Sequence, residues 1–321
     1  GGADLRAQRK AVTLKGESGP IKVHHSSDFG WIGNQDVTEE FAELLESGEL
    51  KPGEELVLDH RYRISGNHAL PDDFALSAVE GAGFDVTDAA KLKGNQPLLE
   101  LGDGNTLRNL TITYLGTPEL GPTGEEPGVT FTKRLGIQAS GKNHLLIENC
   151  RLVGSIGHHL KLVDCRQPKV IGCHVAGGHW SIYIIGIADA VFRRCLIEKC
   201  QGDGIKTGQG SQGVVRRALV EECVFQDNLR DGIDTTGGFN DSIVRSCIFR
   251  RMGVSGMDIK ASYHLKAGRI EDHPPENVSI LIEKCLFHDM PNAIVLTTND
   301  GGRIQGGPGK GFLNASNMKT Y

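Results

Sequence analysis

The sequence predicts an all-β solenoid, a parallel β-helix with an N-terminal capping helix, and three observations support that prediction. Glycine supplies 43 of the 321 residues, about twice its usual share, which indicates frequent turns. Helical periodicity is absent from the central stretch, where the apolar runs are only strand-sized. Six of the eight cysteines recur in one sequence context at intervals of 22 to 38 residues: Cys150, Cys173, Cys195, Cys223, Cys247 and Cys285. Self-similarity at such a period is the mark of a solenoid.

A second set of segments repeats in phase with the cysteines and supplies another strand in each turn. Each is a short β-type run entered through glycine, as in residues 204–208, 232–236 and 256–260. A chain that makes one circuit per repeat and stacks like strands on like strands is a parallel β-helix. We expect its coils to run from about residue 53 to residue 298.

The ends of a solenoid expose its core and need covering. Residues 38–48 predict a capping helix that begins with Thr38 as its N-cap and stops at a glycine. The first strands are expected at residues 53–58 and 62–66. Residues 299–321 predict a glycine-rich, loop-like tail.

The repeated cysteines are expected to point inward as a core ladder, because cysteine behaves as a small buried hydrophobe. No two cysteines have the CxxC spacing, so a structural zinc cluster is not favoured. Disulfides or another metal are the alternatives for this column. The number of cysteines therefore does not indicate the redox compartment.

Composition also limits the partners of the chain. A net charge of −5 argues against nucleic acid, whose binding proteins usually carry a basic surface. No stretch approaches the roughly 20 apolar residues of a membrane-spanning helix, so no membrane partner is expected. We expect a single domain over residues 1–321, in a secreted or periplasmic protein whose leader is not part of this chain. The oligomeric state is left open.

Strand alternation predicts a row of polar side chains on the outer surface of one sheet. In the glycine-entered segments the apolar residue after glycine points inward, so the next residue points outward, and adjacent rungs lie about 4.8 Å apart. The resulting line consists of Lys161, Tyr183, Lys206, Asp234 and Asp258, with Lys260 beside it. A solvated β-helix face explains any single member, whereas this mixture on one flat sheet suits an extended sugar chain.

The capping helix, the segments PGEELVLD and YRISG, and the glycine- and asparagine-punctuated rungs resemble the pectate-lyase-like superfamily of right-handed β-helices. The resemblance covers nearly the whole chain and implies a right-handed coil. That superfamily includes polysaccharide lyases, glycoside hydrolases, esterases, epimerases and phage tailspikes, so the resemblance in fold does not decide the activity.

A narrower resemblance lies in residues 228–234, which are similar to the Asn-x-x-Asp-Gly-x-Asp rung of family 9 pectate lyases. It implies a lysine base on a later rung, for which Lys260 is the nearest counterpart. The chain departs from the pattern there, because Asp258 stands two residues after the glycine, where the family has its lysine. The resemblance implies calcium, and no other cofactor, with three candidate ligands: Asp203, Asp231 and Asp234.

These residues could support two reactions and one binding function. In a lyase, a base removes the proton α to a uronate carboxylate and a cation stabilises the charge that develops. Lys206 or Lys260 is the expected base, provided that a neighbouring cation and partial burial lower its pKa, and Tyr183 is the expected proton donor to the leaving oxygen. In a glycoside hydrolase or transglycosidase, Asp234 and Asp258 would form the acid and nucleophile pair. A tailspike-like adhesin would bind carbohydrate without chemistry.

The preferred prediction is a polysaccharide lyase that cleaves a uronate-containing acidic polysaccharide by β-elimination. Calcium on the aspartates or a nearby arginine would neutralise the substrate carboxylate. The predicted substrate-binding residues are Lys161, His159, His179, Arg230 and Arg251.

Overall fold

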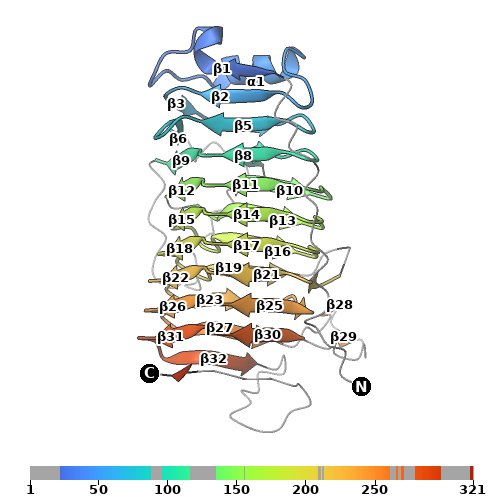
Figure 1. The fold of residues 1–321 in the computed structure, drawn as a ribbon, viewed down its shortest axis with the longest axis vertical. Helices are drawn as coiled ribbons and strands as arrows, with labels where there is room; N and C mark the ends of the chain where they lie inside the picture. Colours follow the sequence, from blue (N-terminus) through green and yellow to red (C-terminus); the bar gives the residue numbers. More distant parts are fainter. Residues whose placement is uncertain are drawn as a thin grey trace.

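The chain winds into a coil of three long sheets, in which successive turns stack along the long axis (Figure 1). The structure is a computed structural model that describes residues 22–87, 96–115, 135–154, 156–208, 211, 213–260, 265–266, 269–270, 279–297 and 319–320. Each full turn contributes one strand to each sheet, and the neighbours within these sheets pair in parallel, as β11 does with β14 and β13 with β16. The predicted parallel β-helix is confirmed.

The strands of each sheet follow in spatial order. Sheet 1 consists of β1 (Val23–His25), β2 (Glu55–Leu58), β5 (Ala75–Ala78), β8 (Thr106–Arg108), β11 (Leu146–Glu148), β14 (Lys169–Ile171), β17 (Val191–Arg193), β21 (Leu219–Glu221), β25 (Ser242–Arg245) and β30 (Ile280–Glu283). Sheet 2 consists of β3 (Arg61–Ile64), β6 (Gly83–Val86), β9 (Thr111–Tyr114), β12 (Arg151–Val153), β15 (His174–Ala176), β18 (Leu196–Glu198), β22 (Val224–Gln226), β26 (Ile248–Arg250), β31 (Leu286–His288) and β33 (Lys319–Thr320). Sheet 3 consists of β4 (His68–Ala69), β7 (Pro97–Glu100), β10 (Leu135–Ser140), β13 (His158–Val163), β16 (Ile182–Ile185), β19 (Ile205–Gly208), β23 (Asp231–Asp234), β27 (Ser255–Lys260) and β32 (Asn292–Thr297). Two short pairs lie outside these sheets: β20 (Val215–Arg216) with β24 (Phe239–Asn240), and β28 (Leu265–Lys266) with β29 (Arg269–Ile270).

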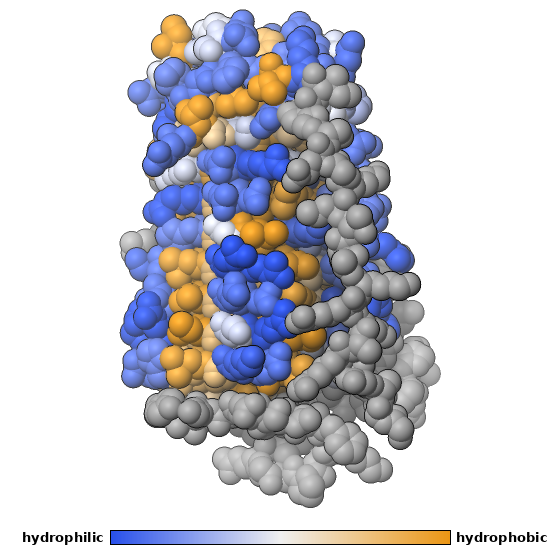
Figure 2. Space-filling view, viewed as in Figure 1, coloured by the Kyte–Doolittle hydropathy of each residue, from blue (hydrophilic) through white to orange (hydrophobic). Residues whose placement is uncertain are grey.

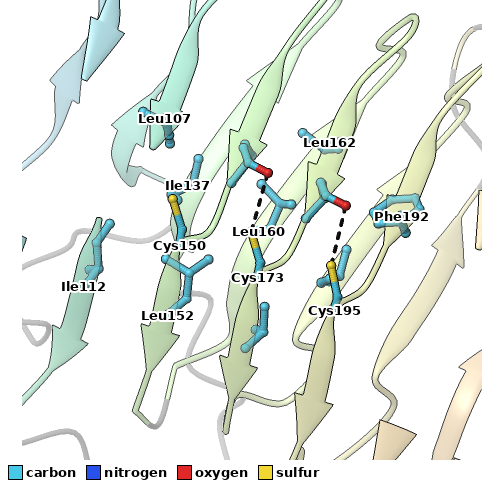
Figure 3. Close-up of a cluster of buried hydrophobic side chains, with 14 of the residues drawn as sticks. Leu107, Ile112, Ile137, Cys150, Leu152, Leu160, Leu162, Cys173, Phe192 and Cys195 are labelled. Carbon is cyan, nitrogen blue, oxygen red and sulfur yellow. Dashed lines mark hydrogen bonds between the residues drawn. The ribbon is translucent and has the colours of Figure 1, made fainter. Parts of the chain in front are cut away.

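Apolar side chains from all three sheets fill the coil. The middle residue of each sheet 1 strand points inward, so Leu107, Ile147, Val170 and Phe192 follow one another in register and are almost completely buried. Figure 3 shows part of this core, with Leu160 and Leu162 of sheet 3 among its members. Each turn therefore buries its apolar face only against its neighbours, as in other solenoids.

The cysteine column lies in the corner between sheets 1 and 2. All eight cysteines are buried, free thiols. The residue before each repeated cysteine has a positive φ, for example 53° at Asn149 and 55° at Glu222, which turns the chain from one sheet to the next. Cys173 Sγ donates to the Ile147 carbonyl of the preceding turn at 3.5 Å (Figure 3). The prediction of an inward core ladder is confirmed.

Stacking in register also produces rows on the outer surface. Rows of hydrophilic and of hydrophobic side chains follow the long axis in Figure 2. On sheet 1, Glu221 accepts from Arg193 at 2.6 Å and from Arg245 at 2.5 Å. Such partly exposed surface pairs contribute about 1 kcal/mol or less each, but opposite charges on adjacent rungs favour the observed register.

The N-terminal end of the coil is covered by α1 (Thr38–Glu46), preceded by the short 3-10 helix η1 (Ser26–Phe29). Phe41 is fully buried, and its ring lies 5.6 Å from that of Phe84 in the first turns of the coil. Val37 is the N-cap and Thr38 is the first helical residue, so the predicted N-cap is off by one residue. Asp36 Oδ1 accepts hydrogen bonds from both the backbone N–H and the hydroxyl of Thr38. The helix covers the N-terminal end of the coil, as predicted.

The predicted C-terminal tail lies mostly outside the described residues. Within it, β33 pairs in parallel with β31, so at least this part is a strand and not a loop. Among the described residues, no helix has the length and apolar character needed to cross a bilayer.

Candidate functional site

Five neighbouring strands of sheet 3, β13, β16, β19, β23 and β27, carry the predicted row of polar residues. The register pairs its members one rung at a time, in the predicted order: Lys161, Tyr183, Lys206, Asp234 and Asp258. Lys260 lies two residues further along β27, and its Nζ is 2.7 Å from Asp234 Oδ2. The row is less open than predicted, because Asp234 has no exposed surface.

A second row, which the sequence analysis did not recognise as one, runs beside the first. Each of its members lies three residues before a member of the first row: His158, Trp180, Asp203, Asp231 and Ser255. Asp203 and Asp231 were predicted only as metal ligands, and His158 and Trp180 were not predicted at all. The signal that would have identified the row is this constant three-residue offset.

Three buried carboxylates form the centre of the site. Oxygens of Asp203, Asp231 and Asp234 all lie within 4.8 Å of one another. Asp234 is fully bonded: Oδ2 accepts from Lys206 and Lys260, and Oδ1 accepts from the backbone and hydroxyl of Thr236 at 2.8 and 2.6 Å. An acid or nucleophile needs a free oxygen directed at the substrate, so the predicted Asp234/Asp258 pair is not suitable for that role.

The other two carboxylates have unsatisfied oxygens. Asp231 accepts from the Ser255 hydroxyl, and Asp203 Oδ1 accepts from the Asp231 backbone N–H at 3.3 Å. Asp203 Oδ2 and Asp231 Oδ2 accept no hydrogen bond within the described part of the chain. Asp203 Oδ2 still lies 3.4 Å from the Lys206 ammonium. A buried oxygen without a donor is costly when it is charged, so it is the Asp231 carboxyl that favours holding a proton.

The pKa values of the three aspartates separate accordingly. Burial, with the charge of Asp203 added to it, raises the pKa of Asp231 to about 7. Burial also raises the pKa of Asp203, against the effect of Lys206. Burial opposes the ionisation of Asp234 as well, but Lys206 and Lys260 outweigh it and hold its pKa below the ordinary value. The site thus combines an ionised carboxylate, Asp234, with two neighbouring carboxyls whose pKa values are raised.

Three cations lie around these carboxylates. Lys206 bonds to Asp234 and lies 3.4 Å from Asp203 Oδ2, and Arg230 Nε is 3.8 Å from Asp203 Oδ1. Burial favours the neutral amine of Lys260, but Asp234 and Asp258 outweigh it and raise its pKa. The condition under which Lys260 was predicted to be the base, a lowered pKa, is therefore not met.

Aromatic rings border the cations on the side of the earlier rungs. The Lys206 ammonium lies 5.3 Å from the centre of the Trp180 ring, in the geometry of a cation–π contact. His158 stacks on Trp180 at 5.5 Å with an interplanar angle of 14°, and Tyr183 lies 5.1 Å from both rings. The Lys206 ammonium therefore contacts the indole as well as the carboxylates.

Calcium does not fit this arrangement. The ion takes roughly six to eight oxygen ligands, whereas two of the three predicted ligands, Asp203 and Asp234, already pair with the ammonium group of Lys206. The third, Asp231, has its pKa raised to about 7. The aspartates are gathered as predicted, but two of them are paired with a lysine.

Two predicted substrate-binding histidines are buried. His159 has no exposed surface, and its Nε2 is 3.1 Å from the Ala176 carbonyl. Burial lowers its pKa to about 4. His179 is only 7% exposed and packs 4.9 Å from the Trp180 ring. The prediction for His159 is wrong because a residue inside the coil cannot touch a polysaccharide, and His179 supports Trp180 from within.

The predicted basic residues differ in position. Arg251 lies at the corner after β26, where its guanidinium is paired with both oxygens of Asp227 at 2.6 and 2.8 Å. It belongs to a different surface from the row, so its predicted role at the site is wrong. Lys161 is half-buried at the start of the row, and burial lowers its pKa. Arg230 lies in the site.

Comparison with known families agrees with the geometry of the coil. The model described as "Right handed beta helix region" matches residues 99–267 and 135–301. The chain belongs to the right-handed β-helix family. This establishes the handedness that the resemblance in sequence implied. A search of curated proteins gives no match to this β-helix protein.

Solved structures of other β-helix proteins share the fold at low identity. A mannuronan C-5 epimerase AlgE6 A-module of Azotobacter vinelandii has 13% identity and a TM-score of 0.55, over 88% of this chain and 82% of that one. A polygalacturonase from Erwinia carotovora ssp. carotovora has 11% identity and a TM-score of 0.54, over 90% and 99%. The Dettilon tailspike protein has 12% identity and a TM-score of 0.50, over 75% of this chain and 51% of the tailspike. This β-helix protein thus spans about half the length of that tailspike.

Proposed function

We propose that this β-helix protein cleaves a uronate-containing polysaccharide by β-elimination, on the face of sheet 3 formed by β16, β19, β23 and β27. The supporting observation is the layering of the site. Its cationic side chains keep some exposed surface, from 12% for Lys206 to 36% for Arg230, above carboxylates with none. A polyanion therefore meets ammonium and guanidinium groups first, although the whole chain carries a net charge of −5.

Elimination needs a cation at the substrate carboxylate and a proton donor at the leaving oxygen. Lys260 and Arg230 supply positive charge at the open surface, and the raised pKa of Lys260 keeps it charged. Burial raises the pKa of Tyr183, so its hydroxyl keeps its proton near neutral pH. We assign the first two to neutralising the uronate and Tyr183 to protonating the leaving oxygen.

Lys206 is the base in this proposal, and it must be neutral to act. Its Nζ lies 3.4 Å from Asp203 Oδ2, which belongs to the carboxyl pair with raised pKa values. Once that pair has lost its own proton, the ammonium proton moves to it, and the amine then takes the proton α to the carboxylate. The C–H electron pair forms the new C=C bond as the C–O bond to the next sugar breaks.

Hydrolysis is the second candidate because Asp231, next to Asp234, has one specific feature that favours it. A carboxyl with a pKa of about 7 beside an ionised carboxylate is the arrangement of a general acid and its partner. Both groups are fully buried in this structure, so hydrolysis would require Lys206 and Arg230 to move aside. Elimination uses groups that are already accessible, and we therefore prefer it.

The structural neighbours are compatible with either reaction and with binding alone, since one is a polygalacturonase, one a mannuronan epimerase and one a tailspike protein.

Extended acidic polysaccharides lie outside the cytoplasm, and we accordingly propose a secreted or periplasmic location. Cell fractionation with an antibody against the chain tests the location.

The reaction is tested by incubating the protein with a panel of polyuronates and neutral polysaccharides. Elimination gives an ultraviolet-absorbing unsaturated uronate, hydrolysis gives new reducing ends without that absorbance, and an adhesin gives binding with no product. We expect the first outcome. Hydrolysis or binding alone would overturn the proposal.

Variants assign the base. Lys206→Ala should lower the rate of elimination by about 10²- to 10⁴-fold with substrate binding largely kept, because a general base is lost. Lys161→Ala is the matched control, since it removes a lysine from the same row two rungs away. Equal effects of the two substitutions would show that Lys206 contributes only charge.

A further inference from the structure

The aspartate triad has the composition of a cation site and already contains a cation. Its three carboxylates are fully buried, with oxygens within 4.8 Å of one another. The Lys206 ammonium bonds to Asp234 and lies 3.4 Å from Asp203. Lys206 in β19 pairs with Asp234 in β23, so the register of these two strands places the lysine beside the triad.

The side chain of Lys206 also contacts an aromatic ring. Trp180 presents its ring face to Nζ at 5.3 Å, and His158 stacks on the indole with ring centroids 5.5 Å apart. A cation–π contact contributes about 0.5 to 2 kcal/mol, the larger value when it is desolvated. Only 12% of the lysine side chain is exposed, so the ammonium is enclosed by an indole and two carboxylates.

We propose that the ammonium of Lys206 is the resident cation of the Asp203–Asp231–Asp234 triad, and that the triad takes up a divalent cation only when this ammonium is removed. The proposal concerns the charge at the triad and does not depend on the proposed reaction.

The other two cations occupy different positions around the triad. Lys260 bonds to Asp234 and Asp258, and Arg230 Nε lies 3.8 Å from Asp203 Oδ1. Without the Lys206 ammonium, Asp203 Oδ2 would lose its ion pair, and Asp231 Oδ2 already has no donor among the described residues. Buried carboxylate oxygens left in this state are the ligands that a hard divalent cation prefers.

Calcium binding tests the proposal without any polysaccharide. Wild type, Lys206→Met, Lys206→Arg and Lys161→Met are freed of metal with a chelator and titrated with CaCl₂ by calorimetry. Terbium luminescence gives a second readout, because Trp180 is close enough to the triad to sensitise a bound lanthanide. We expect one equivalent of Ca²⁺ to bind Lys206→Met at least about tenfold more tightly than the wild type, with a rise in its Tm. Lys206→Arg and Lys161→Met should behave as the wild type does.

Two results would overturn the proposal. One is wild-type protein that binds Ca²⁺ as tightly as Lys206→Met and loses this binding in Asp231→Asn. The other is a folded Lys206→Met, judged by circular dichroism, that binds no divalent cation. If Lys206→Met does not fold without metal, refolding in millimolar CaCl₂ decides, since recovery is expected and failure to recover counts against the proposal. Loss of activity alone has no bearing on these outcomes, so the proposed reaction can fail independently.

Discussion

At the scale of single residues, the protonation of Asp231 links the site to the stability of the fold. Its folded-state pKa of about 7 lies above the roughly 3.9 of an exposed aspartate. The folded protein therefore binds more protons at this residue than the unfolded chain between those two values. The stability that this proton supplies is present at low pH and is lost as the pH rises toward 7.

Asp231→Asn tests this linkage because an amide imitates the neutral carboxyl. The free energy of unfolding of the wild type should fall between about pH 4 and pH 7, and the variant should lack this fall. Above pH 7 the variant should be the more stable of the two. Urea unfolding at a series of pH values measures both curves. Asp258→Asn is the control, because it makes the same substitution at a nearby aspartate that is partly exposed. Parallel curves for wild type and Asp231→Asn would show that Asp231 is ionised throughout.

Asp231 also separates elimination from hydrolysis through the sign of the pH effect on rate. Lys206 can pass its proton to the Asp203/Asp231 pair only when that pair has lost its own, so elimination should accelerate as the pH rises through about 7. A hydrolase that uses Asp231 as general acid would slow over the same range. Initial rates of product formation across this range give the sign, and a falling rate would contradict the assignment of Lys206 as base.

At the scale of the elements, strict alternation of inward and outward side chains predicted the first row but not the second row beside it. In β13, His159 and Leu160 are both buried, and both of their N–H groups donate to the Ser181 carbonyl, at 3.0 and 3.1 Å. This local break makes His158, three residues before Lys161, the one that shares its face. A period of two therefore selects the wrong histidine of the pair.

The side-chain contacts between rungs could not be predicted from the sequence. Register could be predicted from the repeat because identical steps along the chain stack identical positions. The reach of Lys260 back to Asp234 and the burial of that aspartate depend on side-chain packing between two turns. Such packing is not periodic, so the pattern predicted which residues are neighbours but not which of them are exposed.

The glycine at the start of β19, β23 and β27 has a packing role that explains its repetition. A Cβ at Gly232 would lie 2.5 Å from Phe249 Cδ1 and 2.6 Å from the Gly256 carbonyl, and a Cβ at Gly256 would meet Phe287 in the same way. The phenylalanines of sheet 2 stack on one another at 4.8 Å, for Phe249 with Phe287 as for Phe225 with Phe249. The glycines thus make room for this aromatic stack directly beneath the site.

Gly232→Ala should therefore destabilise the protein by about 1 to 3 kcal/mol, as overpacking of a core does, and should disturb Asp231 and Asp234 on either side of it. Thermal unfolding monitored by circular dichroism measures the loss of stability. The rate of cleavage of a polysaccharide substrate measures the disturbance of the two aspartates. Gly33→Ala is the control, because its Cβ would lie no closer than 3.4 Å to His60. A Gly232→Ala protein with unchanged Tm would mean that the phenylalanine stack can shift to accommodate a methyl group.

At the scale of the whole molecule, the cap and the site lie on different turns and communicate only through the turns between them. Turn-to-turn contacts are the only long-range contacts of a solenoid, so its stability is approximately a sum of local and nearest-neighbour contributions. α1 covers the first turns, whereas the site is built on β16 to β27, toward the other end of the coil (Figure 1). A defect in the cap should consequently loosen the first turns before it reaches the site.

Phe41→Ala and Phe249→Ala compare a defect in the cap with a defect beside the site. Each removes a fully buried ring, from the cap in one case and from the stack beneath the site in the other, and each should cost about 3 to 5 kcal/mol locally. Hydrogen exchange followed by mass spectrometry should show lost protection in β2 and β4 for Phe41→Ala, with β19 and β23 still protected and activity kept. Phe249→Ala should show the reverse pattern, because its loss lies next to the site. If both variants instead lose protection equally in all turns, the coil unfolds as one cooperative unit, and the cap then stabilises the site as directly as the turns around it do.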